Sequence, residues 1–381
     1  MFRLIKQSKK DQSRIGEIAT NHGIFHTPIF MPPGTQASVK AIAPDDLERI
    51  EAEIILVNAL HLHLRPGEEL IQYLGGIHNF MGFKRPILSD SGGFQAWSLS
   101  QRGPKLSKIT EEGVEFQSPI NGSKHFITPE KAIEIEHKIG SDIIMAFDEC
   151  APDNNDKEYI RQSMERTHRW AERSLLKHQE LSQKEKDNNQ NSPLLFGIIQ
   201  GGIFSDLRKQ SAEFISSLPF DGLALGGETI GYNMPRTLEI IEELKSILPQ
   251  DKPLYTMGLG ASPLDVLEVV KRGVDMFDCV NPARIARHGG LYSGHLVFHE
   301  KEITFESEDK NGILNINNSR FKDDKKPIDD SCDCYTCKNF SRAYLRHLYQ
   351  AQEPLYLRLA TLHNLRFMIK LIQDLRKHIV L

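Results

Sequence analysis

Eight short apolar runs recur between residues 29 and 280, and stretches with a helical pattern separate them. The runs do not alternate apolar with polar residues, which is typical of strands buried on both faces. Such strands in alternation with helices predict a parallel sheet, and eight is the number that closes a (β/α)8 barrel. The runs begin at Ile29, Glu53, Pro86, Asp142, Leu194, Gly222, Pro253 and Val274.

A doubly wound open sheet is the main alternative fold. We favour the barrel because eight runs are present and no G-x-G-x-x-G turn follows the first of them. The stretches between the runs carry helix signals. Thr128 is placed as an N-cap with Gly140 at the helix end, and Ser262 and Asp265 have the spacing of a capping box. Further helices are predicted at 44–50, 66–80, 158–180, 205–218 and 234–247.

Three stretches do not fit the repeat. Residues 96–128 contain Asn121-Gly122 between alternating segments, which predicts a β-hairpin inserted after the third strand. Residues 183–192 are polar and predict a loop. Residues 289–381 begin with alternating, strand-like sequence, continue through three cysteines and end with a helical pattern. We therefore expect a barrel over 1–288, with the insertion at 96–128, and a subdomain with C-terminal helices over 289–381.

The composition excludes several protein classes. The chain has 381 residues, of which 39% are hydrophobic, and this is enough for a packed core. No apolar run approaches the roughly 18 residues needed to cross a bilayer, and the N-terminus lacks the apolar segment of a secretory signal, so we expect a cytoplasmic protein without a membrane span. The net charge is −4, yet residues 331–381 hold eight Lys or Arg against three Asp or Glu. This local excess suits either a solvated helix face or an anionic partner.

Polar side chains follow five of the predicted strands. Because a barrel keeps its chemistry at the C-terminal ends of its strands, we expect a shared active site there, rather than unrelated helix caps. Neighbouring glycines would allow close approach to the backbone. The strand-end residues are Asp90, Asp148, Glu149, Gln200, Glu228 and Asp278.

Carboxylates confined in one cavity suit nucleophilic displacement at an acetal-like carbon with general acid/base help. At least one of them should have a raised pKa, because like charges held together do not all ionise easily. Asp and Gln side chains also match the hydrogen-bonding edge of a guanine-like base. A retaining glycoside hydrolase is an alternative, but it leaves the C-terminal cysteines unexplained.

Three cysteines form a C-x-C-x2-C cluster, namely Cys332, Cys334 and Cys337. With one histidine they make a closed tetrahedral zinc site, which predicts a structural metal and not a catalytic one. His347, His363 and His378 compete for the fourth position on spacing alone. Cys150 and Cys279 are expected to be buried strand-end residues. A basic turn after the eighth strand contains Arg284 and Arg287, which suit the phosphates or bases of an extended substrate, or simply a surface loop.

Taken together, these motifs resemble the tRNA-guanine transglycosylase family of the bacterial type, over nearly the whole chain from about Ile24 onwards. The segments that carry the resemblance are HTPIFMPPGTQASVK, NALHLHLRPG, LSDSGGFQ, SDIIMAFDEC, GIIQGG, MGLG, GVDMFDCVNPAR, CDCYTCKNFSRAYL and HNL. The resemblance implies a (β/α)8 barrel with a zinc-binding subdomain. It also implies exchange of guanine at the wobble position of GUN-anticodon tRNAs for a 7-deazaguanine.

The resemblance assigns roles to individual residues. Asp278 would be the nucleophile that forms a covalent intermediate with the ribose, and Asp90 the general acid/base. Zinc would be held by His363 together with the three cysteines. The family is typically a homodimer. The base would be bound by Asp148, Gln200, Gly226 and Gly227 and sandwiched by Phe94 and Met257, and the flanking uridines would be held by Arg284 and Arg287.

The chain departs from the family pattern at two places. It reads NALHL where NTYHL is usual, and GGETIGYN where GGLSVGE is usual, so that Glu228 and Tyr232 occupy unusual positions. The usual bacterial substrate is 7-aminomethyl-7-deazaguanine, and Glu228 would be placed to bind its amine or the secondary amine of queuine. Queuine salvage is therefore one alternative, although Cys150 follows the bacterial pattern. A non-catalytic tRNA-binding partner subunit is another, but the chain keeps both Asp90 and Asp278.

Overall fold

The computed structural model describes residues 1–93, 107–152, 156–260, 262–299 and 303–380. Its central sheet has eight parallel strands, each within one of the eight predicted apolar runs. Neighbouring strands in the sheet are consecutive in this set of eight, and the first strand along the chain also pairs with the last. The strands are β4 (Ile29–Met31), β5 (Ile55–Asn58), β6 (Ile87–Asp90), β10 (Ile143–Met145), β11 (Leu194–Ile199), β12 (Gly222–Leu225), β13 (Leu254–Thr256) and β14 (Met276–Asp278).

The sheet closes into a barrel between β4 and β5. The amide of Leu56 donates to the carbonyl of Pro32 at 3.1 Å, and the amide of Gly34 donates to the carbonyl of Leu56 at 2.6 Å. Because β4 also pairs with β14, every strand has two neighbours. The predicted (β/α)8 barrel is confirmed.

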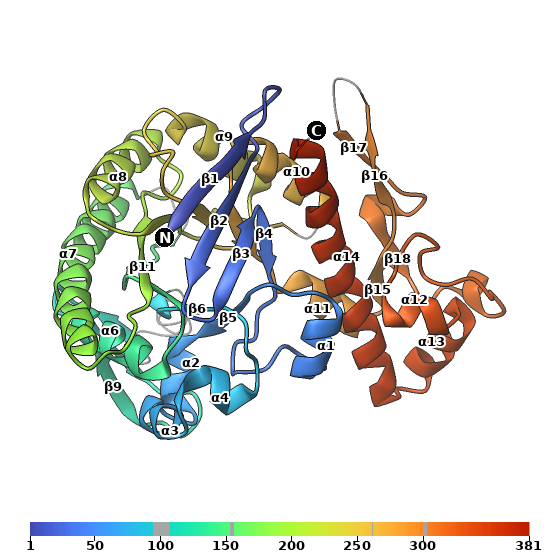
Figure 1. The fold of residues 1–381 in the computed structure, drawn as a ribbon, viewed down its shortest axis with the longest axis horizontal. Helices are drawn as coiled ribbons and strands as arrows, with labels where there is room; N and C mark the ends of the chain where they lie inside the picture. The colour runs from blue at the N-terminus through green and yellow to red at the C-terminus, as the bar shows by residue number, and fades with distance from the viewer. Residues whose placement is uncertain (94–106, 153–155, 261, 300–302, 381) are drawn as a thin grey trace.

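Apolar side chains fill the barrel interior, and a sheet that the sequence analysis missed covers its N-terminal end (Figure 1). This antiparallel sheet consists of β1 (Phe2–Gln7), β2 (Arg14–Thr20) and β3 (Gly23–Thr27). Ile18 and Phe25 from it join the interior cluster. The Arg14 guanidinium also bonds the buried Asp275 carboxylate, just before β14, with N–O distances of 2.6 and 3.0 Å. Because this sheet covers the N-terminal end of the barrel, a binding site is expected at the C-terminal end.

Helices follow the barrel strands much as the sequence predicted. Thr128 caps its helix by accepting the Lys131 amide, and the Ser262–Asp265 capping box is present. The predicted helix at 66–80 is divided in two at Leu74 and Gly75. The helices are α1 (Pro44–Arg49), α2 (Ala59–Leu64), α3 (Glu68–Tyr73), α4 (Gly76–Met81), α6 (Pro129–Ile139), α7 (Lys157–Asp187), α8 (Ser205–Ser217), α9 (Met234–Leu244), α10 (Pro263–Lys271) and α11 (Asn281–Arg287).

The predicted loop at 183–192 is wrong over its first half, because α7 continues to Asp187. The His137 ring contacts the Glu185 carboxylate at 2.7 Å, and this contact ties the end of α7 to α6. Polar composition therefore marked an exposed helix end and not a loop.

The predicted hairpin is present as part of a three-stranded antiparallel sheet. Its strands are β7 (Ser107–Ile109), β8 (Val114–Gln117) and β9 (Lys124–Ile127), and Asn121-Gly122 lies in the turn between β8 and β9. Residues 94–106, which include the first part of the predicted insertion, lie outside the described residues.

The C-terminal segment joins the barrel through one long helix, α14 (Pro354–Val380). Figure 1 shows α14 between the barrel and the remaining C-terminal elements, and it contacts β2 and β4 on one side and α12 and α13 on the other. In the described ranges, no helix combines the length and apolar character needed to cross a membrane. The other C-terminal elements are β15 (Gly290–Tyr292), β16 (His295–Phe298), β17 (Ile303–Glu306), the 3-10 turns η1 (Lys310–Gly312) and η2 (Ser319–Phe321), β18 (Ile313–Asn315), α12 (Tyr335–Asn339) and α13 (Arg342–Gln350).

Candidate active site

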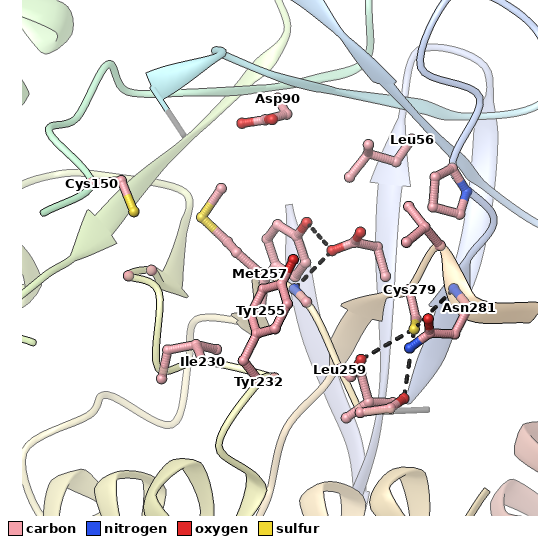
Figure 2. Close-up of a pocket in the computed structure, with 18 of the residues that line it drawn as sticks. Leu56, Asp90, Cys150, Ile230, Tyr232, Tyr255, Met257, Leu259, Cys279 and Asn281 are labelled. Atoms are coloured by element: carbon pink, nitrogen blue, oxygen red, sulfur yellow. Dashed lines mark hydrogen bonds between the residues drawn. The ribbon is translucent and has the colours of Figure 1, made fainter. Parts of the chain in front are cut away.

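A cavity of about 530 Å³ opens at the C-terminal ends of the barrel strands. Three of the predicted strand-end carboxylates line it, from β6, from the segment after β10 and from β14. Figure 2 shows Asp90 and Tyr255 among the residues that surround it. The lining residues used below are Asn58, Asp90, Asp148, Cys150, Gly226, Gly227, Ile230, Gly231, Tyr232, Tyr255, Met257, Gly258, Asp278 and Arg284.

Asp278 stands at the end of β14 and is held through one carboxylate oxygen. Oδ1 accepts the Tyr255 hydroxyl at 2.8 Å and the backbone amide of Gly258 at 2.9 Å. Burial raises the pKa of Asp278 to about 6, while these two hydrogen bonds lower it and the charge of Asp90 raises it further. A carboxylate with this pKa is largely ionised at neutral pH and available as a nucleophile.

Asp90 ends β6 and is fixed by an amide from the neighbouring strand. Asn58 accepts the His61 amide through its side-chain oxygen as the N-cap of α2, so its NH2 group faces Asp90. That NH2 group donates to Asp90 Oδ2 at 2.7 Å. Oδ2 is therefore occupied as an acceptor, and Oδ1 lies 3.5 Å from the backbone amide of Gly92, which donates to it.

Asp148 and Gln200 form a second polar pair. The neighbouring glycines Gly93 and Gly226 leave space for these two side chains. The Gln200 side-chain amide donates to Asp148 Oδ2 at 2.6 Å. A Cβ atom at Gly93 would lie 2.2 Å from Asp148 Oδ1, and one at Gly226 would lie 2.9 Å from Gln200 Nε2. Burial raises the pKa of Asp148 to about 7, against the lowering effect of Gln200. The expectation of at least one raised carboxyl pKa is confirmed.

Not every predicted site residue reaches the cavity wall. Gly226, Gly227, Met257 and Arg284 line the cavity, whereas Gln200 reaches it only through Asp148, and Glu228 and Arg287 are not part of its wall. Glu228 is half-buried in the loop after β12. Burial raises the pKa of the Cys150 thiol, which lines the cavity, and the charge of Glu228 adds to this effect. Phe94 lies outside the described residues.

Glu149 turns away from the cavity towards α7. Its carboxylate accepts the Tyr159 hydroxyl at 2.8 Å and pairs with the Arg166 guanidinium. The predicted carboxylate cluster is therefore Asp90, Asp148 and Asp278, without Glu149. Cys150 and Cys279 are both buried, as expected.

Three contributors were missed from the sequence: Asn58, Arg208 and Tyr255. Arg208 is fully buried, and its guanidinium donates to the carbonyls of Ile199, Gly202 and Gly226. It thereby fixes the loops after β11 and β12. A tyrosine inside an apolar strand needs a partner for its hydroxyl, and this signal in PLYTMGLG pointed to Tyr255.

The three cysteines of the predicted metal site converge on His363, in α14, and not on His347 or His378. The Sγ atoms of Cys332, Cys334 and Cys337 lie 3.7, 3.6 and 3.3 Å from His363 Nδ1. A tetrahedral zinc ion with Zn–S near 2.3 Å and Zn–N near 2.05 Å requires S–N separations of about 3.5 Å. The four buried groups therefore fit a tetrahedral metal ion.

The surroundings of this group orient its ligands. His363 Nε2 lies 2.7 Å from the carbonyl of Tyr292, so this nitrogen carries the hydrogen and Nδ1 faces the thiols. Asp333, between two of the cysteines, forms a two-point ion pair with Arg366 at 2.6 and 2.7 Å, and Arg366 also reaches Glu51. The cysteine loop is thus fastened both to α14 and to the barrel.

Comparison with known proteins decides the family. The family model described as queuine tRNA-ribosyltransferase matches residues 9–380. The chain belongs to this family. A protein named queuine tRNA-ribosyltransferase from Thermoanaerobacter sp. (strain X514) is 49% identical over 378 residues, which cover 99% of this chain and 93% of the relative. Relatives with the same name from Halothermothrix orenii and Staphylococcus aureus (strain JH9) are each 48% identical over 375 residues, 98% of this chain and 92% and 91% of their own lengths.

The resemblance read from the sequence motifs is confirmed by this match. Membership at this identity and coverage makes the chain a transferase. The cavity described above, with its three carboxylates and its glycine-lined wall, is then the candidate place for the transfer reaction.

Proposed function

We propose that this transferase exchanges guanine at the wobble position of GUN-anticodon tRNAs for a 7-deazaguanine, through a covalent Asp278–ribose intermediate. The observation that carries the proposal is the state of Asp278, which is held by two donors at one oxygen inside a cavity that two further carboxylates share. Family membership supplies the substrate class.

In the first displacement, Asp278 Oδ2 attacks C1′ of the ribose. The C1′–N9 bond breaks, and its electron pair leaves with guanine. Asp90, whose carboxyl group is held in place by Asn58, donates a proton to the departing base. In the second displacement, Asp90 takes the proton from N9 of the incoming base, N9 bonds to C1′ and the Asp278 carboxylate leaves. Two inversions at C1′ retain the configuration.

Asp148 and Gln200 are proposed to bind the base edge. An ionised Asp148 accepts hydrogen bonds from the adjacent N–H groups of guanine, and Gln200 holds the carboxylate in place. Gly226 and Gly227 allow the base to lie against the backbone, and Met257 packs against its face. Phe94 remains the predicted partner on the other face.

Arg284 and Arg287 are proposed to hold the nucleotides that flank the target base. Both side chains are exposed on α11, directly after the Asp278 strand, and neither takes part in an ion pair with the residues that the structure describes. A cation that is not neutralised by the protein is suited to a phosphate or to a base edge.

The choice of incoming base is proposed to depend on Glu228. This carboxylate stands beside the wall that contains Cys150, where a 7-substituent of the base would project. It would pair with the primary amine of 7-aminomethyl-7-deazaguanine or with the secondary amine of queuine. Tyr232 lines the same cavity and is 77% exposed, and queuine salvage is kept as a second candidate function.

Zinc is the metal that we propose for Cys332, Cys334, Cys337 and His363. Its role is structural, because four protein ligands leave no open position. We also propose that residues 1–288 form the catalytic barrel and 289–381 the zinc-binding subdomain with the C-terminal helices. The homodimer and the cytoplasmic location expected from the sequence stay predictions.

The test is base exchange into an unmodified GUN-anticodon tRNA, read at the wobble nucleoside by mass spectrometry. Labelled guanine, 7-aminomethyl-7-deazaguanine and queuine are offered separately. We expect exchange by the wild type and none by Asp278→Asn, while Asp251→Asn, exposed at the other end of the barrel, stays active. If no base enters with the wild type, the proposal fails, and the alternative of a non-catalytic tRNA-binding partner subunit gains support. If queuine alone enters, the enzyme salvages the finished base.

A further inference from the structure

The two oxygens of Asp278 are in different environments. Oδ1 accepts both the Tyr255 hydroxyl and the Gly258 amide, at 2.8 and 2.9 Å. No other described residue donates a hydrogen bond to Oδ2. Figure 2 draws the two bonds that meet on the single held oxygen. A carboxylate held in this way presents one oxygen to the substrate, while the other stays hydrogen-bonded to the protein.

The fold prepares both donors in advance. Tyr255 lies on β13 next to β14, is 1% exposed and packs in the barrel interior with Phe196 and Met276. Burial and the charge of Asp278 raise the pKa of its hydroxyl, so the hydroxyl keeps its proton and only donates. Gly258 has a φ of +103°, a conformation that glycine adopts without strain and that aims its amide at Asp278.

We propose that Tyr255 is a positioning residue that reserves Oδ2 of Asp278 for attack on the ribose and makes the carboxylate a good leaving group in the second displacement. The inference rests on the proposed function. In the first step Oδ2 forms a bond to C1′ and the carboxylate loses its charge. In the second step the C1′–Oδ2 bond breaks, its electron pair returns to the carboxylate, and the negative charge is again shared with Oδ1, where Tyr255 donates.

The two steps therefore respond in opposite directions to the loss of this donor. A hydrogen bond to a charged acceptor is stronger than one to a neutral ester. It stabilises the carboxylate before the first step, and it stabilises the charge that develops in the second step. Without it, formation of the covalent intermediate is as fast or faster, while its breakdown is slower.

The experiment compares Tyr255→Phe with the wild type in single-turnover reactions on a GUN-anticodon tRNA. Phe fills the same space in the core, and a urea unfolding curve checks that the variant is folded. We expect breakdown of the covalent adduct to slow by about tenfold, the size of a hydrogen bond to a charged group, and the adduct to accumulate. The acid limb of kcat/KM should also move to higher pH, because Asp278 loses a donor that favours its ionised form.

Tyr356→Phe is the matched control, since Tyr356 is buried in the C-terminal segment and its hydroxyl has no hydrogen-bond partner among the described residues. It should change neither the adduct kinetics nor the acid limb. If Tyr255→Phe also leaves both unchanged, Tyr255 only fills the barrel and the inference is overturned. If the wild type itself forms no adduct, the proposed function fails instead, so the two failures are distinguishable.

Discussion

Glu136 is a buried carboxylic acid near Asp90, and its pKa predicts how the stability of the protein depends on pH. It lies on α6, is 0% exposed, and accepts the Met145 amide at 3.2 Å through Oε1. Burial raises its pKa well above the usual value, and the nearby Asp90 charge adds to the effect. Glu136 therefore keeps its proton to a higher pH in the folded protein than in the unfolded chain, where it ionises above about pH 4.3.

The raised pKa sets the sign of the pH dependence. Folding must bind a proton at Glu136 once the unfolded chain has lost it, so the stability contributed by this group falls as pH rises towards the folded-state pKa. The slope is about 1.4 kcal/mol per pH unit. Glu136→Gln has the same shape and no titration, and its amide oxygen still accepts the Met145 amide. We expect the stability of the variant to rise relative to the wild type as pH rises from the unfolded-state pKa towards the folded-state pKa, by up to about 1.4 kcal/mol per pH unit.

The assay is reversible urea unfolding at several values between pH 5.5 and pH 8.5, followed by the fluorescence of Trp170, which is fully buried against Phe147. Glu134→Gln is the control, because Glu134 is half-exposed on the same helix and pairs with Lys177. Its effect should not depend on pH in this range. A gap between Glu136→Gln and the wild type that does not change with pH would refute a raised pKa of Glu136 in the folded protein.

Four further predictions concern the metal group, the loops and the site. Cys334→Ser should lower zinc content, measured by atomic absorption, together with the unfolding midpoint, and full zinc content would mean that the ligand set is wrong. Arg208→Met should destabilise the protein by more than about 3 kcal/mol in urea, because the buried carbonyls of Gly202 and Gly226 lose their donor and that of Ile199 keeps only the Gly226 amide. The KM for the incoming base should fall as pH rises through about 7, because ionised Asp148 is the acceptor form, and a flat profile would exclude that role. Arg284→Ala should raise the KM for tRNA more than the KM for the free base, and equal effects would place Arg284 at the base.

Local pattern was sufficient for the elements of the barrel. The strand runs were predictable because a strand buried on both faces is apolar throughout, and the helix from Thr128 was predictable because its capping signals act within a few residues. The N-terminal sheet was not recognised, because β1 has exposed apolar residues, Leu4 and Ile5, and does not show a clear alternation. The polar end of α7 was read as a loop, because the His137–Glu185 contact that holds it joins distant parts of the chain.

The site was predictable in its members but not in its geometry. The topology of a barrel brings Asp90, Asp148 and Asp278 together wherever they lie in the sequence, which is why strand ends were informative. The rotation of each side chain is decided by partners. Glu149 follows Asp148 directly, yet it turns to Arg166 on α7 and leaves the cavity. The glycines were expected to admit a ligand, whereas Gly226 also makes room for Gln200.

The most direct test of the account is the site of covalent attachment. Wild-type protein is incubated with a GUN-anticodon tRNA, denatured and digested, and the peptide that carries the ribose is mapped by mass spectrometry. We predict attachment at Asp278 and no attachment in Asp278→Asn. We expect Asp90→Asn to be folded and still able to bind the tRNA. An adduct that persists in Asp278→Asn, or that maps to Asp90 or Asp148, would contradict the assignment of the nucleophile.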